Sequence, residues 1–410
     1  MKTLILLVFV CFLAAFAGTR LAGSLQGTDF PDFYCAAHML ADGHGDQLYD
    51  AEIQRNYQAR YAGRVGTLYI HPPFEAVLYL AVAWLPLQRA YLLWTFLNLA
   101  FLAVGARRLA NEALAPWDWR ALLAAALTFV PLLLCLVQGQ DSVLLLLLLV
   151  LAFAALRRDQ GFAAGCWLGL GLFKFQLALP LLLVLLLTQN RRTRNALAKG
   201  FILVALTLAG LSAAISGWSV FTVYPRFLLH LQAQPFAGII PGAMANFRGL
   251  TSFFIHDDHS PWAITAVAIL SAAALIKTLT VWKRTGLISQ PNPASHTHDQ
   301  FDLAFANTVL FALLVSYHLN PHDLSLLLLP ISLLLHRMLA RTRRPGLANW
   351  ITLGMLAILF LPPPHLWALR AGCYGLISLP LLVLFLTVGF IERPQSRNGG
   401  HSLPNTSTPQ

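Results

Sequence analysis

Two aspartates near the start of the chain have the residue type and the setting of a catalytic base. Asp29 and Asp32 lie in the sequence Gly-Thr-Asp-Phe-Pro-Asp-Phe-Tyr (27–34), shortly after the apolar segment Leu4–Ala17. A carboxylate held beside aromatic residues at the edge of an apolar environment can take a proton from an attacking hydroxyl group. Asp is also favoured at helix N-caps. Capping is therefore the alternative for Asp29, and for Asp32 it is the better interpretation.

The composition places these residues in a membrane protein. Apolar residues make up 57% of the chain, charged residues 11%, and the mean hydropathy is +0.64, whereas soluble domains carry roughly 25% charged residues. Long apolar segments recur, and they must be helices because lipid offers no hydrogen-bond partners to the backbone. They are Leu4–Ala17, Ala90–Gly105, Ala121–Val137, Val143–Leu156, Phe201–Trp218, Trp262–Trp282, Ala304–Tyr317, Leu324–Leu335 and Leu366–Ile391. We predict an all-α polytopic membrane protein with about 11–13 transmembrane helices.

Basic residues occur in short clusters between the apolar segments, and these clusters indicate the orientation. They are Arg107–Arg108, Arg157–Arg158, Arg191–Lys199, Lys283–Arg284 and Arg341–Arg344. Lys and Arg collect in cytoplasmic loops, so we expect all five clusters on the cytoplasmic side. The net charge of +11 forms neither one basic face nor a basic tail, and we therefore expect no nucleic-acid partner.

If all basic clusters lie on the cytoplasmic side, two apolar segments cannot each cross the membrane once. Residues 67–87 would then not span the membrane. We expect the segment from His71 to Leu87 to lie along the outer surface as a helix, within a large first outer loop (21–88). We expect residues 162–187 to hold two short crossings that meet at Lys174 on the outer side. The polar segments of the chain then converge on the extracytoplasmic face, which is where we expect the chemistry.

The same reasoning divides the chain into four parts. Residues 1–285 form an N-terminal catalytic transmembrane module with outer loops 21–88 and 219–261. Residues 286–300, rich in Pro, Ser and His, are expected to be a cytoplasmic connector. Residues 301–392 hold the C-terminal transmembrane helices, and residues 393–410 are expected to be a disordered cytoplasmic tail.

Eight further polar residues on the expected outer side are candidates for substrate binding: His71, Gln140, Lys174, Gln176, Arg248, His318, His322 and Asp323. Lys174 stands alone among apolar residues and can offer a cation to a phosphate, with snorkelling to the interface as the alternative. Arg248 can hold a phosphate through two hydrogen bonds. His71 precedes two prolines, so a role in directing the chain is its simpler interpretation.

A metal site at His318, His322 and Asp323 is a weaker alternative, because Pro321 would interrupt a helix that joins the two histidines. The five cysteines show no paired spacing, so we predict neither a disulfide framework nor a zinc motif. We expect no metal and no tightly bound cofactor.

Five short motifs follow one another in the first half of the chain. They are Asp-Phe-x-x-Phe-Tyr-x-Ala-Ala (29–37), Leu-Tyr-Asp (48–50), Tyr-Ile-His-Pro-Pro (69–73), Gly-Gln (139–140) before a Leu-rich segment, and Lys-Phe-Gln (174–176). Their order resembles that of glycosyltransferase family 87, whose members are polytopic enzymes of the C-type (GT-C) superfamily. The resemblance covers residues 1–190 best. The family pattern has Tyr where this chain has His71 and Pro where it has Phe175, which indicates a different acceptor or lipid preference.

The resemblance implies a GT-C fold and a mannosyltransferase that uses a polyprenyl-phosphate sugar donor. It also implies an aspartate of the first outer loop as base, which by position is Asp29. The chemistry agrees, because a lipid phosphate departs as a stable anion and one base suffices, unlike the two carboxylates of glycosidases.

We therefore expect an enzyme of the plasma (inner) membrane that transfers a hexose to a glycolipid or glycan acceptor on the extracytoplasmic side, with membrane lipid as its environment. A secondary transporter is one alternative, although transporters usually carry their polar residues near the bilayer midplane. Another lipid-linked-sugar enzyme, such as an oligosaccharide polymerase or ligase, is the second.

Overall fold

The computed structural model describes residues 25–284, 296–341 and 346–390, apart from short gaps at 26, 64, 232–238, 256 and 258. Within these ranges the chain is helical and contains no strand, which confirms the all-α prediction. The segment Leu4–Ala17, most of the expected connector and the expected tail lie outside the described residues.

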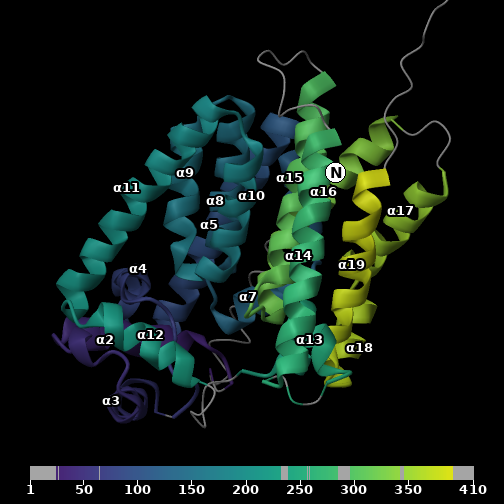
Figure 1. The fold of residues 1–410 in the computed structure, drawn as a ribbon. Helices are drawn as coiled ribbons and strands as arrows, with labels where there is room; N and C mark the ends of the chain where they lie inside the picture. Colours follow the sequence, from purple (N-terminus) through teal and green to yellow (C-terminus); the bar gives the residue numbers. More distant parts are fainter. Residues whose placement is uncertain are drawn as a thin grey trace, which may run out of the picture.

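The long helices run side by side along one direction and form the body of the molecule (Figure 1). They are α5 (Leu87–Ala113), α8 (Ser142–Arg157), α9 (Gly161–Leu170), α10 (Phe175–Thr188), α11 (Arg191–Ser216), α14 (Pro261–Arg284), α15 (His296–Val315), α16 (Leu328–Arg341), α17 (Leu347–Phe360) and α19 (Ser378–Thr387). Shorter elements connect them: α6 (Trp119–Ala126), α7 (Val130–Gln138), α13 (Phe247–Ser252), α18 (Pro362–Arg370), η3 (Gly171–Lys174), η5 (Pro241–Ala243), η6 (Pro321–Leu327), η7 (Tyr374–Ile377) and η8 (Val388–Phe390).

A second group of short helices gathers at one end of this bundle, at the bottom of Figure 1. It consists of α2 (Phe30–Ala41), η1 (Gly45–Gln47), α3 (Ala51–Tyr57), η2 (Gln58–Ala62), α4 (Pro73–Ala83) and α12 (Val220–His230). Helix α4 is seen nearly along its own axis in Figure 1, so it lies across the direction of the long helices. Its direction is the one expected for the helix from His71 to Leu87, although α4 covers only Pro73–Ala83.

Five helical segments of the described chain are long and apolar enough to cross a membrane, or up to seven if each of two bent pairs forms one span. The expected number of 11–13 is larger than this. Part of the difference arises because several apolar segments fold into short or broken helices, such as α8 and the pair α6 and α7, which bends by 73°. In addition, Leu4–Ala17 lies outside the described residues, and Gly161–Thr188 is counted once. These helices, together with large apolar side chains exposed on their surfaces, such as Ile202, Leu203 and Leu206 on α11, identify a membrane protein.

The segment Gly161–Thr188 consists of α9, η3 and α10 in direct succession, and the chain reverses direction within it. A straight helix of 28 residues would separate its ends by roughly 42 Å. Instead, Thr193, just after α10, donates to Asp159, just before α9, at 2.8 Å. The reversal falls at Lys174, whose ψ of 61° is not helical. Helices α9 and α10 therefore run in opposite directions, with Lys174 at the turn between them, as the sequence predicted.

Small residues let α9 and α11 approach each other closely. A Cβ on Gly200 of α11 would overlap the carbonyl oxygen of Phe162, and one on Gly165 of α9 would overlap that of Leu197. Close backbone approach through small residues is a common means of helix association in membranes. This contact holds α9, and with it the turn at Lys174, against the rest of the bundle.

The basic clusters lie away from the short helices. Helix α11 begins at Arg191, and its other end at Ile215 contacts Gly45 of η1. Arg157 at the end of α8 pairs with Asp302 of α15 at 3.3 Å, and Arg158 pairs with Glu112 of α5 at 2.7 Å. The short helices and these basic residues therefore occupy opposite ends of the bundle, as the charge pattern predicted.

We expect Gly200→Ala to lower the thermal stability of the detergent-solubilised protein, because overfilling a packed contact typically destabilises by ~1–3 kcal/mol. Gly210→Ala is the matched control on the same helix, since a Cβ there meets no atom within 4 Å. Melting followed by size-exclusion chromatography measures both. Equal melting temperatures for the two variants would contradict the close α9–α11 contact.

Candidate functional site

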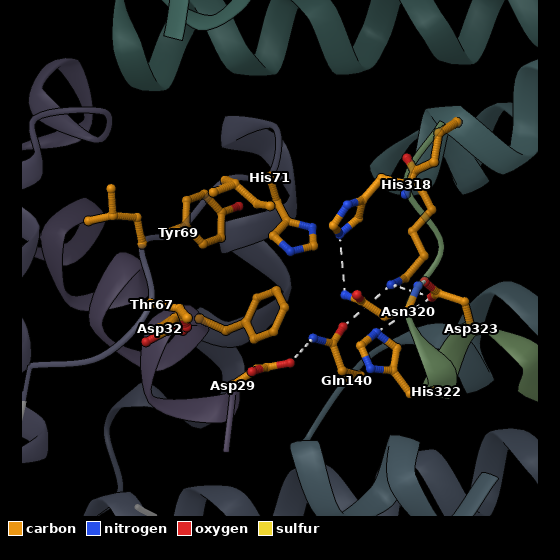
Figure 2. Close-up of a pocket in the computed structure, with 15 residues that line it drawn as sticks. Asp29, Asp32, Thr67, Tyr69, His71, Gln140, His318, Asn320, His322 and Asp323 are labelled. Carbon is orange, nitrogen blue, oxygen red and sulfur yellow. Dashed lines mark hydrogen bonds and ion pairs between the residues drawn. The ribbon is translucent and has the colours of Figure 1, made fainter. Parts of the chain in front are cut away.

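The sequence-predicted polar residues meet in one pocket of about 80 Å³ at the end of the bundle that carries the short helices (Figure 2). It is lined by Asp29, Asp32, Phe33, Thr67, Leu68, Tyr69, Ile70, His71, Gln140, Lys174, Gln176, His318, Asn320, His322 and Asp323. Residues separated by almost three hundred positions thus share one cavity. Of the ten candidates taken from the sequence, nine line it, and Arg248 does not.

Lys174 is the cation of the pocket and is buried, with 2% of its surface exposed. Its ammonium group lies 2.9 Å from Asp323 Oδ1, 3.3 Å from Asp141 Oδ1 and 3.4 Å from Gln140 Oε1. Asp323 also accepts from Ser142 Oγ at 2.8 Å. A buried ammonium requires such partners, so snorkelling to the interface does not describe this residue. Two carboxylates already balance its charge.

Asp29 is linked to this network through Gln140. The Gln140 side-chain amide donates to Asp29 Oδ2 at 2.7 Å, while its oxygen accepts from Lys174. Asp29 occupies the N-cap position of α2 but makes no side-chain capping hydrogen bond. Its carboxylate is instead directed into the pocket (Figure 2).

The close approach of Asp29 and Gln140 depends on Gly139. This residue has a φ of +69°, and a Cβ there would come within 2.6 Å of Phe30 Cβ. Phe30 in turn packs edge-on against Tyr91 at 5.4 Å. The turn after α7 therefore fits directly against the first residue of α2, which places Gln140 beside Asp29.

Asp32 has a different environment, although it lines the same pocket. It is 6% exposed, accepts from the Gln58 amide at 3.0 Å and forms a short hydrogen bond with Thr67. Both carboxylate oxygens thus tie α2 to the segment that leads to α4. This arrangement favours an anchoring role over direct catalysis.

His71 lines the pocket and is held from behind by a residue that the sequence analysis did not single out. Its Nδ1 lies 3.0 Å from Glu75 Oε2, with the Glu75 side chain fully buried. Burial lowers the pKa of His71 to about 4 and raises the pKa of Glu75. His71 is therefore neutral at physiological pH.

His318 and His322 come from the segment before and within η6. Asn320 Nδ2 donates to His318 Nε2 at 3.2 Å, and His322 Nε2 lies 3.6 Å from Asp323. Burial lowers the pKa of His318 to about 4. Among the described residues, no three His, Cys, Asp or Glu side chains are arranged to hold a metal ion.

Arg248 lies outside the lining of this pocket. It is 5% exposed, and its guanidinium stacks over the ring of Tyr317 at 4.3 Å. Tyr317 in turn lines a second, larger cavity.

That second cavity has a volume of about 620 Å³ and a largely apolar wall. It shares Ile70, His71, Gln176 and His318 with the polar pocket. Much of the remaining wall comes from α12 and the residues after it, including Tyr224, Leu228 and Leu231. Tyr224 is fixed by stacking on Tyr49 at 4.9 Å and by donating to the carbonyl of Ile70. A polar and an apolar compartment therefore adjoin.

The sequence analysis singled out neither Glu75 nor Asp141. Asp141 holds the N-cap position of α8 without a capping hydrogen bond, and its side chain contacts Lys174 instead. A signal for Glu75 was present, since it is an acid within an apolar segment, four residues after His71. No comparable signal marked Asn320 as the partner of His318.

A sequence model of glycosyltransferase family 87 matches residues 69–317, which is more than half of the chain. The protein belongs to glycosyltransferase family 87. The matched range contains His71, Gln140 and Lys174, whereas Asp29 precedes it and Asp323 follows it. No curated protein matches the chain. The molecule is thus a membrane glycosyltransferase, whose substrates are a sugar donor and an acceptor.

We expect Lys174→Met to destabilise the protein strongly, because it leaves Asp141 and Asp323 buried without a cation. Breaking a buried ion pair from one side typically costs ~3–5 kcal/mol. The double variant Lys174→Met/Asp323→Asn should recover part of the lost melting temperature, and the exposed Lys199→Met serves as control. Identical melting of the Lys174 and Lys199 variants would rule out the network.

Proposed function

We propose that this glycosyltransferase moves a hexose, most simply mannose, from a polyprenyl phosphate to an acceptor hydroxyl on the extracytoplasmic side, with Asp29 as general base. The observation that carries the proposal is the position of Asp29 in a small polar pocket that opens beside a much larger apolar cavity. A lipid-linked sugar likewise joins a polar part, the sugar, to an apolar part, the lipid chain.

The shared wall of the two compartments suggests where the two parts of such a donor would lie. Isoprenoid units fit the apolar cavity beside α12, and the sugar fits the polar pocket. The phosphate would then lie near Gln176 and His318, which face both compartments. His318 accepts from Asn320 through Nε2, so its Nδ1–H remains a neutral donor for a phosphate oxygen.

The proposed reaction balances with a single base. As the acceptor oxygen forms its bond to the anomeric carbon, its proton passes to Asp29, and the bond from that carbon to the phosphate oxygen breaks. The lipid phosphate leaves with the electron pair as an anion. Gln140 holds the Asp29 carboxylate in one orientation through its 2.7 Å hydrogen bond.

The proposed role of Lys174 differs from the sequence-based expectation that it binds the donor phosphate. Its three N–H groups face Asp323, Asp141 and Gln140, and its charge is balanced within the protein. We propose that it organises Gln140 and both carboxylates. Direct contact with the donor phosphate would require a phosphate oxygen to replace Asp141 or Gln140 at its ammonium group.

Asp29→Asn should reduce transfer by ~10²- to 10⁴-fold, the usual contribution of a general base, without loss of folded protein. Membranes incubated with radiolabelled polyprenyl-phosphate-mannose would be assayed for a labelled lipid or glycan product. Asp46→Asn is the control, since Asp46 is an exposed carboxylate at the same end of the molecule. Wild-type transfer by the Asp29 variant would end its assignment as base.

The sidedness of the site can be measured separately in intact cells. Glu52 is exposed on α3, at the end of the molecule that holds the pocket, and Arg192 is exposed near the start of α11 at the opposite end. We expect Glu52→Cys to react with a membrane-impermeant maleimide added outside, and Arg192→Cys to react only after the membrane is opened. The reverse pattern would place the pocket on the cytoplasmic side.

A further inference from the structure

Two carboxyl groups that the proposed reaction does not use lie against each other behind the pocket. Glu75 of α4 and Asp141 before α8 are both fully buried, with no exposed surface. Their side chains are within hydrogen-bonding reach of each other. Asp141 also contacts Lys174 at 3.3 Å, and Glu75 also contacts His71 at 3.0 Å. The four groups form a continuous row from Lys174 to His71.

Two carboxylates in such contact cannot both remain ionised. The Lys174 ammonium lies on the Asp141 side of the pair and is also held by Asp323, so it favours the charged form of Asp141. A single proton between Glu75 and Asp141 removes the repulsion and satisfies oxygens that otherwise find no donor. That proton is then engaged between the two carboxyl groups and is not available to His71.

The remaining contact decides which nitrogen of His71 carries its proton. Glu75 Oε2 lies 3.0 Å from His71 Nδ1, although the two form no directed hydrogen bond as they stand. Because the shared proton is directed at Asp141, Glu75 can act toward Nδ1 only as an acceptor. We propose that Glu75 and Asp141 share one proton and that this pair holds neutral His71 as the Nδ1–H tautomer, so that Nε2 accepts a hydrogen bond from a carbohydrate hydroxyl. Glu75 is thereby a positioning residue for His71.

The position of His71 agrees with this role. Its side chain is 19% exposed, whereas that of Glu75 is fully buried, so the ring is open to the pocket on one side only. Figure 2 shows the imidazoles of His71 and His318 facing each other across this space. An unprotonated Nε2 attracts an O–H group and disfavours a phosphate oxygen, so His71 would bind the sugar or the acceptor alcohol.

Several charged or titratable groups face Glu75, and they affect the pH at which the shared proton leaves. They are His71, Asp141, Lys174, Asp323, Tyr49, Tyr69, Tyr79 and Tyr224. Burial, the largest influence, raises the pKa of both Glu75 and Asp141. The pair therefore keeps its proton at neutral pH and loses it as the pH rises through the raised pKa.

A first test needs no sugar transfer. Infrared spectra of the purified protein at pH 7 should contain the C=O band of a buried protonated carboxyl group, and Glu75→Gln and Asp141→Asn should each remove it. Nitrogen-15 spectra, with His71→Asn used for assignment, should show a protonated Nδ1 and an unprotonated Nε2 for His71. Absence of the carboxyl band, or a doubly protonated His71, would overturn the inference whether or not the protein transfers mannose.

A second test rests on the proposed function and compares two variants of similar volume. In Glu75→Gln the amide can donate to Asp141 and accept from His71, as the protonated acid does, so transfer at pH 7 should stay within about threefold of wild type. Glu75→Leu leaves both partners unsatisfied and should lower transfer about 10-fold or more. Wild-type transfer should fall at alkaline pH, and this fall should be absent in Glu75→Gln.

The kinetic constants then identify the bound hydroxyl. A raised KM for the lipid-linked sugar in Glu75→Leu would place His71 on the donor sugar, and a raised KM for the acceptor would place it on the acceptor alcohol. Equal loss of transfer in the Gln and Leu variants would show an ionised Glu75 and would contradict the shared proton. If no variant and no wild-type protein transfers mannose, the proposed function fails while the spectroscopic test still decides the tautomer.

Discussion

The buried charge of Lys174 is the constraint on which the rest of the site depends. An ammonium group removed from water must be surrounded by acceptors and opposite charge. Asp141, Asp323 and Gln140 provide these, and they come from segments far apart in the chain. The same contacts orient Gln140 toward Asp29. One solvation requirement therefore joins the start of α2, the turn after α7, the α9–α10 reversal and η6 into one pocket.

Helix packing around this network holds the elements that carry Lys174 and Asp29 in place. Glycines in α9 and α11 bring two backbones together where larger residues would collide. This contact fixes the position of the turn that carries Lys174 relative to α11. On the other side, aromatic packing within the short helices, with Phe33 stacked on Tyr79 at 4.6 Å, joins α2 to α4. Asp32 adds a polar tie between α2 and the segment before α4. The carboxylate proposed as base thus sits on a firmly held element.

Two compartments with opposite character meet at the same residues, and this juxtaposition links the fold to its proposed use. A flexible lipid chain needs volume and apolar walls, whereas a sugar needs a small number of directed hydrogen bonds. Helix α12 supplies much of the apolar wall and is held in place through Tyr224. The two histidines at the junction are kept neutral by burial, so they act there as hydrogen-bonding groups and carry no charge.

The sequence by itself determined the class of the protein, and it singled out most of the polar residues that line the pocket. Composition indicated a membrane protein, the basic clusters indicated one common end, and isolated polar residues such as Asp29, Lys174 and Asp323 stood out because apolar segments rarely tolerate them. The tertiary structure alone decided the pairings. It made Asp141 a partner of Lys174, removed Arg248 from the polar pocket, and revealed Glu75 behind His71. Local sequence reports what a residue prefers within its own helix, whereas a buried charge takes its partner from whichever segment the fold brings within hydrogen-bonding distance.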